Sequence, residues 1–131
     1  MARVLVIDDE QDILVLCRLN LRRAGHEVLE ALDGEHGIAL AREHRPDAIV
    51  LDLMLPTMDG YDVLDALVRE RDLYDPALVV LTAKARQEDR IRSLSGGADE
   101  FVTKPFSPDH LVEVLDRLLG ERLATRPGGS D

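Results

Sequence analysis

Four short apolar runs, each followed directly by a residue with a charged or hydroxyl side chain, constrain the fold of this chain most strongly. The runs are Val4–Ile7, Ala48–Leu51, Ala77–Leu81 and Phe101–Val102. Their length and unbroken hydrophobicity are typical of strands that are buried on both faces of a parallel sheet. In open α/β sheets, ligands bind beyond the carboxyl ends of the strands. The polar residues after these runs are therefore predicted to meet at one site.

Helical and extended patterns alternate along the chain, which predicts five βα units. The first helical pattern ends at Gly25 and leads into a further extended segment, His26–Ala31. Four more helices are predicted: one of about ten residues after Asp33-Gly34, then Gly60–Arg71, Gln87–Ser95, and one with Ser107 as N-cap and Pro108 as first residue. We therefore expect an α/β fold with a doubly wound parallel sheet.

The length of 131 residues and a hydrophobic content of 45% fit a single domain with one core. We expect the domain to span residues 1–122. Residues 123–131 include Arg126–Ser130, whose composition is typical of a flexible tail or a truncated linker. The net charge of −10 disfavours binding to nucleic acid or to anionic membranes, because both require a basic surface.

The single cysteine, Cys17, lies on the apolar face of the first predicted helix and is interpreted as a core residue. It has no partner for a disulfide within the chain, which favours a reducing compartment. No apolar stretch approaches the roughly 18 residues of a membrane span. We therefore expect a cytoplasmic protein without a membrane partner.

The residues at the strand ends indicate phosphate chemistry. Three carboxylates, from Asp8, Asp9 and Asp52, would repel one another unless a cation lay between them, and oxygen ligands without His or Cys suit Mg²⁺. Lys104 can neutralise a phosphate and Thr82 can donate a hydrogen bond to it. Asp52 follows the run that looks most central, so it is the best candidate for a nucleophile that forms an aspartyl phosphate.

Each of these residues also has a plainer interpretation. Asp8 and Asp9 could cap the first helix, and Asp52 could simply form a turn. Thr82 could be an ordinary strand-end residue, and Lys104 a solvated charge. Their joint occurrence at successive strand ends favours a shared site over four unrelated explanations.

The motifs that carry these residues resemble the receiver domain of bacterial two-component response regulators, over about residues 2–120. The matching segments are Val4–Glu10, Asp47–Gly60, Leu81–Ala83 and Gly97–Phe106. The resemblance implies a flavodoxin-like fold with strand order 2-1-3-4-5. It also implies that Asp52 accepts a phosphoryl group from a sensor histidine kinase or a histidine phosphotransfer protein. By the same resemblance, the receiver passes a signal to a partner or an output domain. It is not expected to be an enzyme, because it only assists its own phosphorylation and slow dephosphorylation.

The resemblance also assigns roles to individual residues. Asp9, Asp52 and the backbone carbonyl of Met54 would hold Mg²⁺, with Asp8 contributing through water. The phosphoryl oxygens would be bound by three groups: the Thr82 hydroxyl, the Ala83 backbone amide and the Lys104 ammonium.

Further implications of the resemblance concern switching and tuning. Phe101 would turn inward as Thr82 moves toward the phosphate, although Phe101 could also be plain strand packing. Lys104-Pro105 would be a cis peptide. Met54 and Lys84 match sites that modulate loss of the phosphoryl group, unless both are ordinary loop residues. Met54 has no group that could orient a water molecule, so slow self-dephosphorylation is predicted.

The output surface is expected to be formed by the fourth helix, fifth strand and fifth helix. Receivers of the winged-helix transcription-factor group dimerise there through charged pairs when phosphorylated. Arg90, Asp99 and Glu100 fit that pattern, whereas His110 and Val114 do not. The apolar stripe between residues 111 and 119 is wide, so part of it could meet a partner, although core packing is the simpler interpretation.

Three other functional classes share parts of this pattern. A phosphatase of the haloacid dehalogenase type needs a second aspartate two residues after the nucleophile, where this chain has Met54. A phosphorylation-independent adaptor with a receiver fold usually lacks pocket residues, and here all five are present. A flavodoxin-like cofactor binder would need a phosphate-binding loop rich in Ser, Thr and Gly after the first strand.

Overall fold

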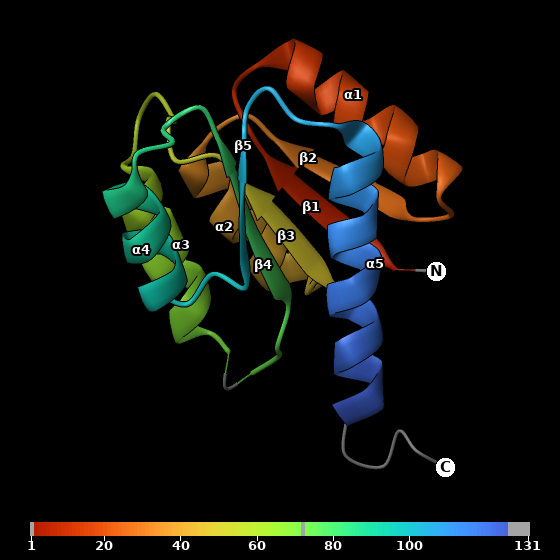
Figure 1. Ribbon diagram of the computed structural model, residues 1–131. Helices are drawn as coiled ribbons and strands as arrows, with labels where there is room; N and C mark the ends of the chain where they lie inside the picture. The colour runs from red at the N-terminus through yellow and green to blue at the C-terminus, as the bar shows by residue number, and fades with distance from the viewer. Residues whose placement is uncertain (1, 72, 126–131) are drawn as a thin grey trace.

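The computed structural model describes residues 2–71 and 73–125, which form one five-stranded parallel sheet with helices on both faces (Figure 1). The strand order is β2-β1-β3-β4-β5, which confirms the order implied by the resemblance. The strands are β1 (Arg3–Ile7), β2 (Glu27–Ala31), β3 (Ala48–Leu51), β4 (Ala77–Thr82) and β5 (Glu100–Thr103). The strand positions agree with the apolar runs, because strands covered on both faces need continuous hydrophobicity.

The five helices follow the predicted positions closely: α1 (Gln11–Arg23), α2 (Gly34–His44), α3 (Gly60–Arg69), α4 (Gln87–Ser95) and α5 (Pro108–Thr125). The side chain of Asp33 accepts a hydrogen bond from the backbone amide of His36 and so caps α2. Helix α3 ends at Arg69, two residues earlier than predicted. The next two amides bond back to Leu67 and Val68, three residues away, which is the tighter pattern of a closing turn.

Two apolar clusters lie on opposite faces of the sheet and form the core. One packs the inward side chains of α2 and α3 against alternate residues of the strands, among them Leu5, Ile49 and Leu78. The other packs α1 and α5 against the intervening residues, such as Val6 and Val50. Figure 1 shows α1 and α5 on one side of the sheet and α2 and α3 on the other, with α4 beside α3. The fold is therefore the doubly wound arrangement that the alternating pattern predicted.

Two sequence interpretations are settled by these clusters. Cys17 is 1% exposed within the cluster beneath α1, where burial raises the pKa of its thiol to about 12, as expected of a core cysteine. The apolar stripe of α5 is mostly core as well. Its buried members are Leu111, Val114, Leu115 and Leu118.

Helix α5 extends through Thr125, three residues into the segment predicted as a tail. Residues 126–131 lie outside the described residues, so the boundary near residue 122 remains a prediction. Within residues 2–71 and 73–125, no helix combines the length and hydrophobicity that crossing a membrane requires.

Candidate functional site

The register of the sheet brings the predicted site residues together at one edge. Ile7 pairs with Leu51, so Asp8 and Asp52 leave neighbouring strands side by side. The ladder continues one residue further, because the backbone amide of Asp52 donates to the carbonyl of Ile7 at 3.0 Å. Thr82 pairs with Thr103, which places Lys104 one residue beyond the same edge. The predicted convergence of strand ends is thus confirmed for Asp8, Asp52, Thr82 and Lys104.

The Lys104 ammonium lies between the two buried carboxylates. Its Nζ donates to Asp8 Oδ2 at 2.7 Å and to Asp52 Oδ2 at 2.9 Å. The side chains of Lys104, Asp8 and Asp52 are 8%, 2% and 3% exposed. A single cation therefore balances two carboxylates that are almost fully removed from water, where charge interactions are strong.

The pKa values reflect this balance. Burial by itself would lower the pKa of Lys104, but hydrogen bonds to Asp8 and Asp52 outweigh burial and raise the pKa above the ordinary 10.5. Burial raises the pKa of Asp8 above the ordinary 3.8, although hydrogen bonds from Lys104 and from the Glu10 amide act in the opposite direction. The two carboxylates therefore favour the charged form of Lys104, while burial disfavours the charged form of Asp8.

Three carboxylates at this edge could hold a metal ion: oxygens of Asp8, Glu10 and Asp52 lie within 4.8 Å of one another. Hard oxygen donors at this spacing fit a small divalent cation. Glu10 was missed from the sequence, although it directly follows Asp8-Asp9. Asp9, which the resemblance assigned to the metal, is exposed and is not one of these three carboxylates.

Thr82 ends β4, the strand beside β3, and Met54 follows Asp52 by two residues. The Thr82 side chain is fully buried, and its Oγ1 accepts a hydrogen bond from the Lys84 amide at 3.1 Å. The Met54 amide donates to Asp52 Oδ1 at 3.0 Å, while its side chain is 56% exposed. One carboxylate oxygen of Asp52 therefore accepts from the Met54 amide, and the other accepts from the Lys104 ammonium.

Comparisons with known proteins agree with this geometry. A family model for the response regulator receiver domain matches residues 4–116. The chain belongs to this family. Among relatives, the alkaline phosphatase synthesis transcriptional regulatory protein PhoP of Bacillus subtilis is 46% identical over 106 residues, which are 81% of this chain and 43% of that protein. The transcriptional regulatory protein PrrA of Mycobacterium tuberculosis is 42% identical over 129 residues, 98% of this chain and 54% of that protein.

Solved receiver structures have the same fold. The receiver domain of the Francisella response regulator 1452 matches with a TM-score of 0.84 and 30% identity, over 92% of this chain and 98% of that chain. The BeF3-activated DrrB receiver domain matches with a TM-score of 0.80 and 30% identity, over the same shares of both chains. This receiver spans about half the length of the relatives PhoP and PrrA.

Phe101, the predicted switch residue of the receiver, is 6% exposed and packs into the core cluster on the α3 side of the sheet. It is therefore turned inward while the Thr82 hydroxyl bonds to the Lys84 amide. The Lys104-Pro105 bond is cis, which confirms that expectation. Ala83 is exposed, directly after Thr82 at the end of β4.

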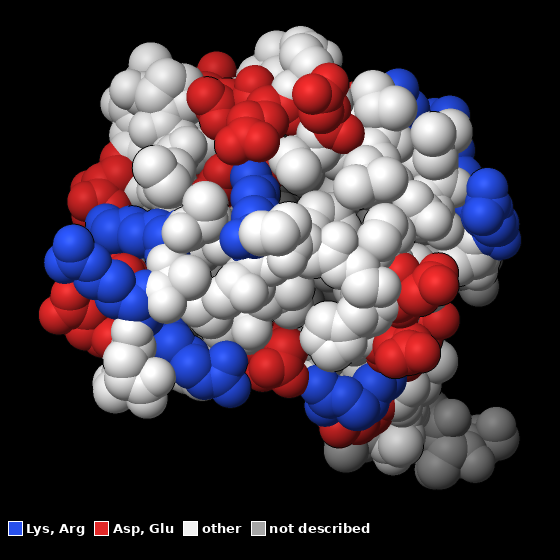
Figure 2. Space-filling view, turned by 45° about the horizontal axis from the view of Figure 1, so that its top comes forward, with Lys and Arg blue, Asp and Glu red and all other residues white. Residues whose placement is uncertain are grey.

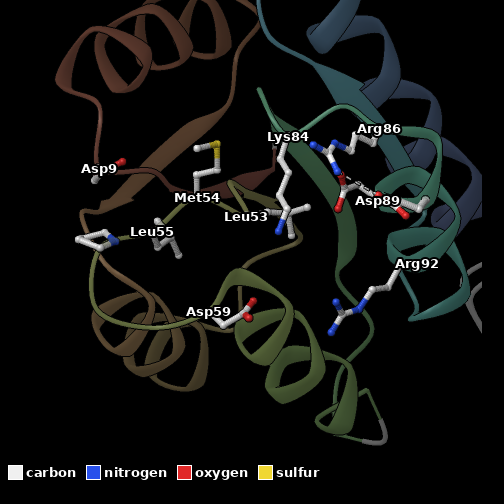
Figure 3. Close-up of a pocket in the computed structure, with 11 residues that line it drawn as sticks. Asp9, Leu53, Met54, Leu55, Asp59, Lys84, Arg86, Asp89 and Arg92 are labelled. Atoms are coloured by element: carbon white, nitrogen blue, oxygen red, sulfur yellow. Dashed lines mark hydrogen bonds and ion pairs between the residues drawn. The ribbon is translucent and has the colours of Figure 1, made fainter.

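The outer part of the site opens into a pocket of about 960 Å³ between the loop after β3 and the start of α4 (Figure 3). Asp9 and Met54 lie on one side of it, and Lys84 and Arg92 lie on the other. Figure 2 shows acidic side chains gathered on the face that carries the carboxyl ends of the strands, with basic ones beside them.

Two of the charged residues expected at a dimer interface, Asp99 and Glu100, bond to arginines within the chain. Asp99 Oδ2 accepts from Arg71 at 3.0 Å and from Arg122 at 2.9 Å, and Glu100 pairs with Arg117 at 2.7 Å. Arg90 and His110 are exposed. Dimerisation of the phosphorylated receiver remains a prediction.

Proposed function

We propose that this receiver accepts a phosphoryl group on Asp52 from a sensor histidine kinase or a histidine phosphotransfer protein. The main support is the Asp52 carboxylate itself, which is buried at a strand end and held by Lys104 and the Met54 amide. An Asp52 oxygen forms the new bond to phosphorus. The bond between phosphorus and the donor's histidine nitrogen breaks, and its electron pair stays on the imidazole.

Mg²⁺ is the proposed cofactor. The chemistry of the donors fits it, because Asp8, Glu10 and Asp52 supply carboxylate oxygens at one point. Asp9 and the backbone carbonyl of Met54 are further proposed ligands, on the strength of the family resemblance. When bound, the ion neutralises negative charge on the transferring phosphoryl group and on the carboxylates.

The remaining pocket residues bind the phosphoryl oxygens. Lys104 is already within hydrogen-bond distance of Asp52, so its ammonium can contact an oxygen on the new phosphoryl group. The Ala83 amide is a second proposed donor. The Thr82 hydroxyl is a third proposed donor, because its Oγ1 only accepts from the Lys84 amide in this structure and its own proton stays available.

The signal leaves the domain through α4, β5 and α5. Thr82 moves toward the phosphoryl group, and the change passes from β4 to the neighbouring strand β5, where Phe101 is already buried. The downstream partner is a protein or an output domain, and a phosphorylation-dependent homodimer is one form of the signalling state. The proposed location is the cytoplasm, where sensor kinases present their catalytic domains.

Incubation with acetyl phosphate and Mg²⁺ tests the phosphoacceptor. Intact mass spectrometry is expected to show one added phosphoryl group on the wild type and none on Asp52→Ala, because only that carboxylate can attack. Asp62→Ala, which removes an exposed aspartate on α3, is the matched control and is expected to be modified like the wild type. An unmodified wild type would favour a phosphorylation-independent adaptor, and a modified Asp52→Ala would refute Asp52 as the acceptor.

Phosphoryl loss from Asp52 is expected to be slow. The Met54 side chain is exposed next to Asp52 and has no group that could orient an attacking water. Met54→Asn introduces an amide that can hold such a water, so it is expected to shorten the phosphoryl lifetime several-fold, whereas Met54→Leu leaves it unchanged. The lifetime is measured by mass after removal of acetyl phosphate in excess Mg²⁺, and loss from the wild type within seconds would contradict the prediction.

A further inference from the structure

Helix α4 packs little apolar surface against the domain, through the partly buried Leu94. Of its nine residues, the two that are buried are Asp89 and Ser93, and its large apolar side chain Ile91 is 55% exposed. No side chain caps its first turn, and it ends at Gly96. A helix that buries so little apolar surface gains little from the hydrophobic effect, so its position depends on individual contacts.

The strongest of these contacts joins α4 to α3. The Tyr61 hydroxyl donates to Asp89 Oδ1 at 2.5 Å, and the two residues are 7% and 6% exposed. Burial, and after it the hydrogen bond to Asp89, raise the pKa of Tyr61 to about 12, so the phenol keeps the proton that it donates. A hydrogen bond to a buried carboxylate is stronger than one between neutral groups.

Only one of the two carboxylate oxygens of Asp89 accepts a hydrogen bond from a described residue. Asp89 Oδ2 is buried and has no hydrogen-bond partner among the residues that the structure describes. An unpaired buried carboxylate oxygen is unfavourable. The Tyr61–Asp89 bond therefore acts against a desolvation cost at the other carboxylate oxygen of the same aspartate.

The Tyr61 ring connects this bond to the phosphoacceptor site. The Arg92 guanidinium of α4 lies 3.7 Å from the ring centroid, and the Lys84 ammonium lies 5.2 Å from it. Lys84 belongs to the loop between β4 and α4, and its backbone amide is the group that holds the Thr82 hydroxyl. Figure 3 shows the side chain of Lys84, from the loop before α4, and that of Arg92, from α4, directed into the same pocket.

We propose that Tyr61 and Asp89 form a latch that keeps α4 and the loop before it in the arrangement of the unphosphorylated receiver. The inference rests on the proposed phosphorylation of Asp52. While the latch is closed, the Lys84 amide holds Thr82 Oγ1 in its present position, which opposes movement of that side chain toward the phosphoryl group. Opening the latch releases the loop, so Tyr61 and Asp89 are positioning residues that oppose phosphorylation.

Tyr61→Phe tests the latch with the smallest change, because it removes the hydroxyl and keeps the ring that Lys84 and Arg92 contact. We expect about tenfold faster phosphorylation by acetyl phosphate, the order expected for a hydrogen bond to a charged group. We also expect faster amide hydrogen exchange confined to α4 and the preceding loop. Tyr74→Phe, at a tyrosine far from the site along the chain, is the matched control and is expected to change neither measurement.

A double-mutant cycle with Asp89→Ala identifies the bond itself. In the Asp89→Ala background, Tyr61→Phe is expected to have no further effect on either measurement, because its partner is already gone. A phosphorylation rate equal to that of the wild type in Tyr61→Phe overturns the latch, and so do fully additive effects in the cycle.

Hydrogen exchange in the Asp52→Ala background separates this inference from the function on which it rests. Faster exchange in α4 of the Tyr61→Phe, Asp52→Ala protein supports the latch even when no phosphoryl group can be accepted. Unchanged exchange there overturns the latch and leaves the assignment of Asp52 untouched. A wild type that acetyl phosphate does not modify overturns the phosphoacceptor function instead.

Discussion

Replacing Gly60 with alanine is expected to lower the free energy of unfolding by about 3 kcal/mol, at the upper end of overpacking effects. A Cβ at this position would lie 2.3 Å from the Cα of Leu53 and 2.4 Å from its carbonyl oxygen. These are backbone atoms, so the clash cannot be relieved by a change of rotamer. Leu53 directly follows Asp52, so the shift that makes room for the methyl group also displaces the phosphoacceptor.

Chemical denaturation of the wild type, Gly60→Ala and Gly120→Ala measures this effect. Gly120 lies in the interior of α5, and a Cβ there would meet nothing within 4 Å. Alanine at Gly120 is expected to raise the free energy of unfolding by about 0.5–1 kcal/mol, because it favours the helix. A Gly60→Ala protein as stable as the wild type would show that the loop after β3 can move without cost. Acetyl phosphate labelling of the same protein reports whether Asp52 remains reactive.

Lys104→Met is expected to destabilise the metal-free protein by about 3 kcal/mol, the order found when one partner of a buried ion pair is removed. Asp8 and Asp52 would then be buried side by side without their shared cation. The pKa of Lys104 is raised in the fold, so its stabilising effect is fully present below pH 10.5, the ordinary pKa, and is lost as the pH rises through the raised value. The wild type and the variant should therefore differ at neutral pH and converge in strong alkali.

Two further measurements assign this effect to the carboxylates. Mg²⁺ is expected to stabilise Lys104→Met more than it stabilises the wild type, because the ion replaces the missing charge. Adding Asp8→Asn to Lys104→Met is expected to recover part of the lost stability by removing one of the two facing charges. The control is Lys84→Met, which changes the other lysine of the chain. Because Lys84 is exposed, we expect little effect on the free energy of unfolding. An unchanged unfolding free energy in Lys104→Met would contradict the bridging role.

The sequence by itself determined the sheet, its helices and the meeting point of the main reactive groups. Strands covered on both faces must be continuously apolar, so their ends are marked by the first polar residues, such as Asp8, Asp52 and Thr82. The end of a parallel strand is also the place where the fold presents side chains to a ligand. The place of a polar residue directly after an apolar run therefore predicted that its side chain would lie at the site.

Only the tertiary structure decided which polar side chains pair with one another. It brought Glu10 to the carboxylate group, joined Tyr61 to Asp89 across 28 residues, and bound Asp99 to arginines of its own chain. Hydrophobic periodicity says which face of an element is buried, but it does not say which polar groups meet across that face. Such pairs depend on the distance and angle between elements that are far apart in sequence, and these are set by packing of the whole core.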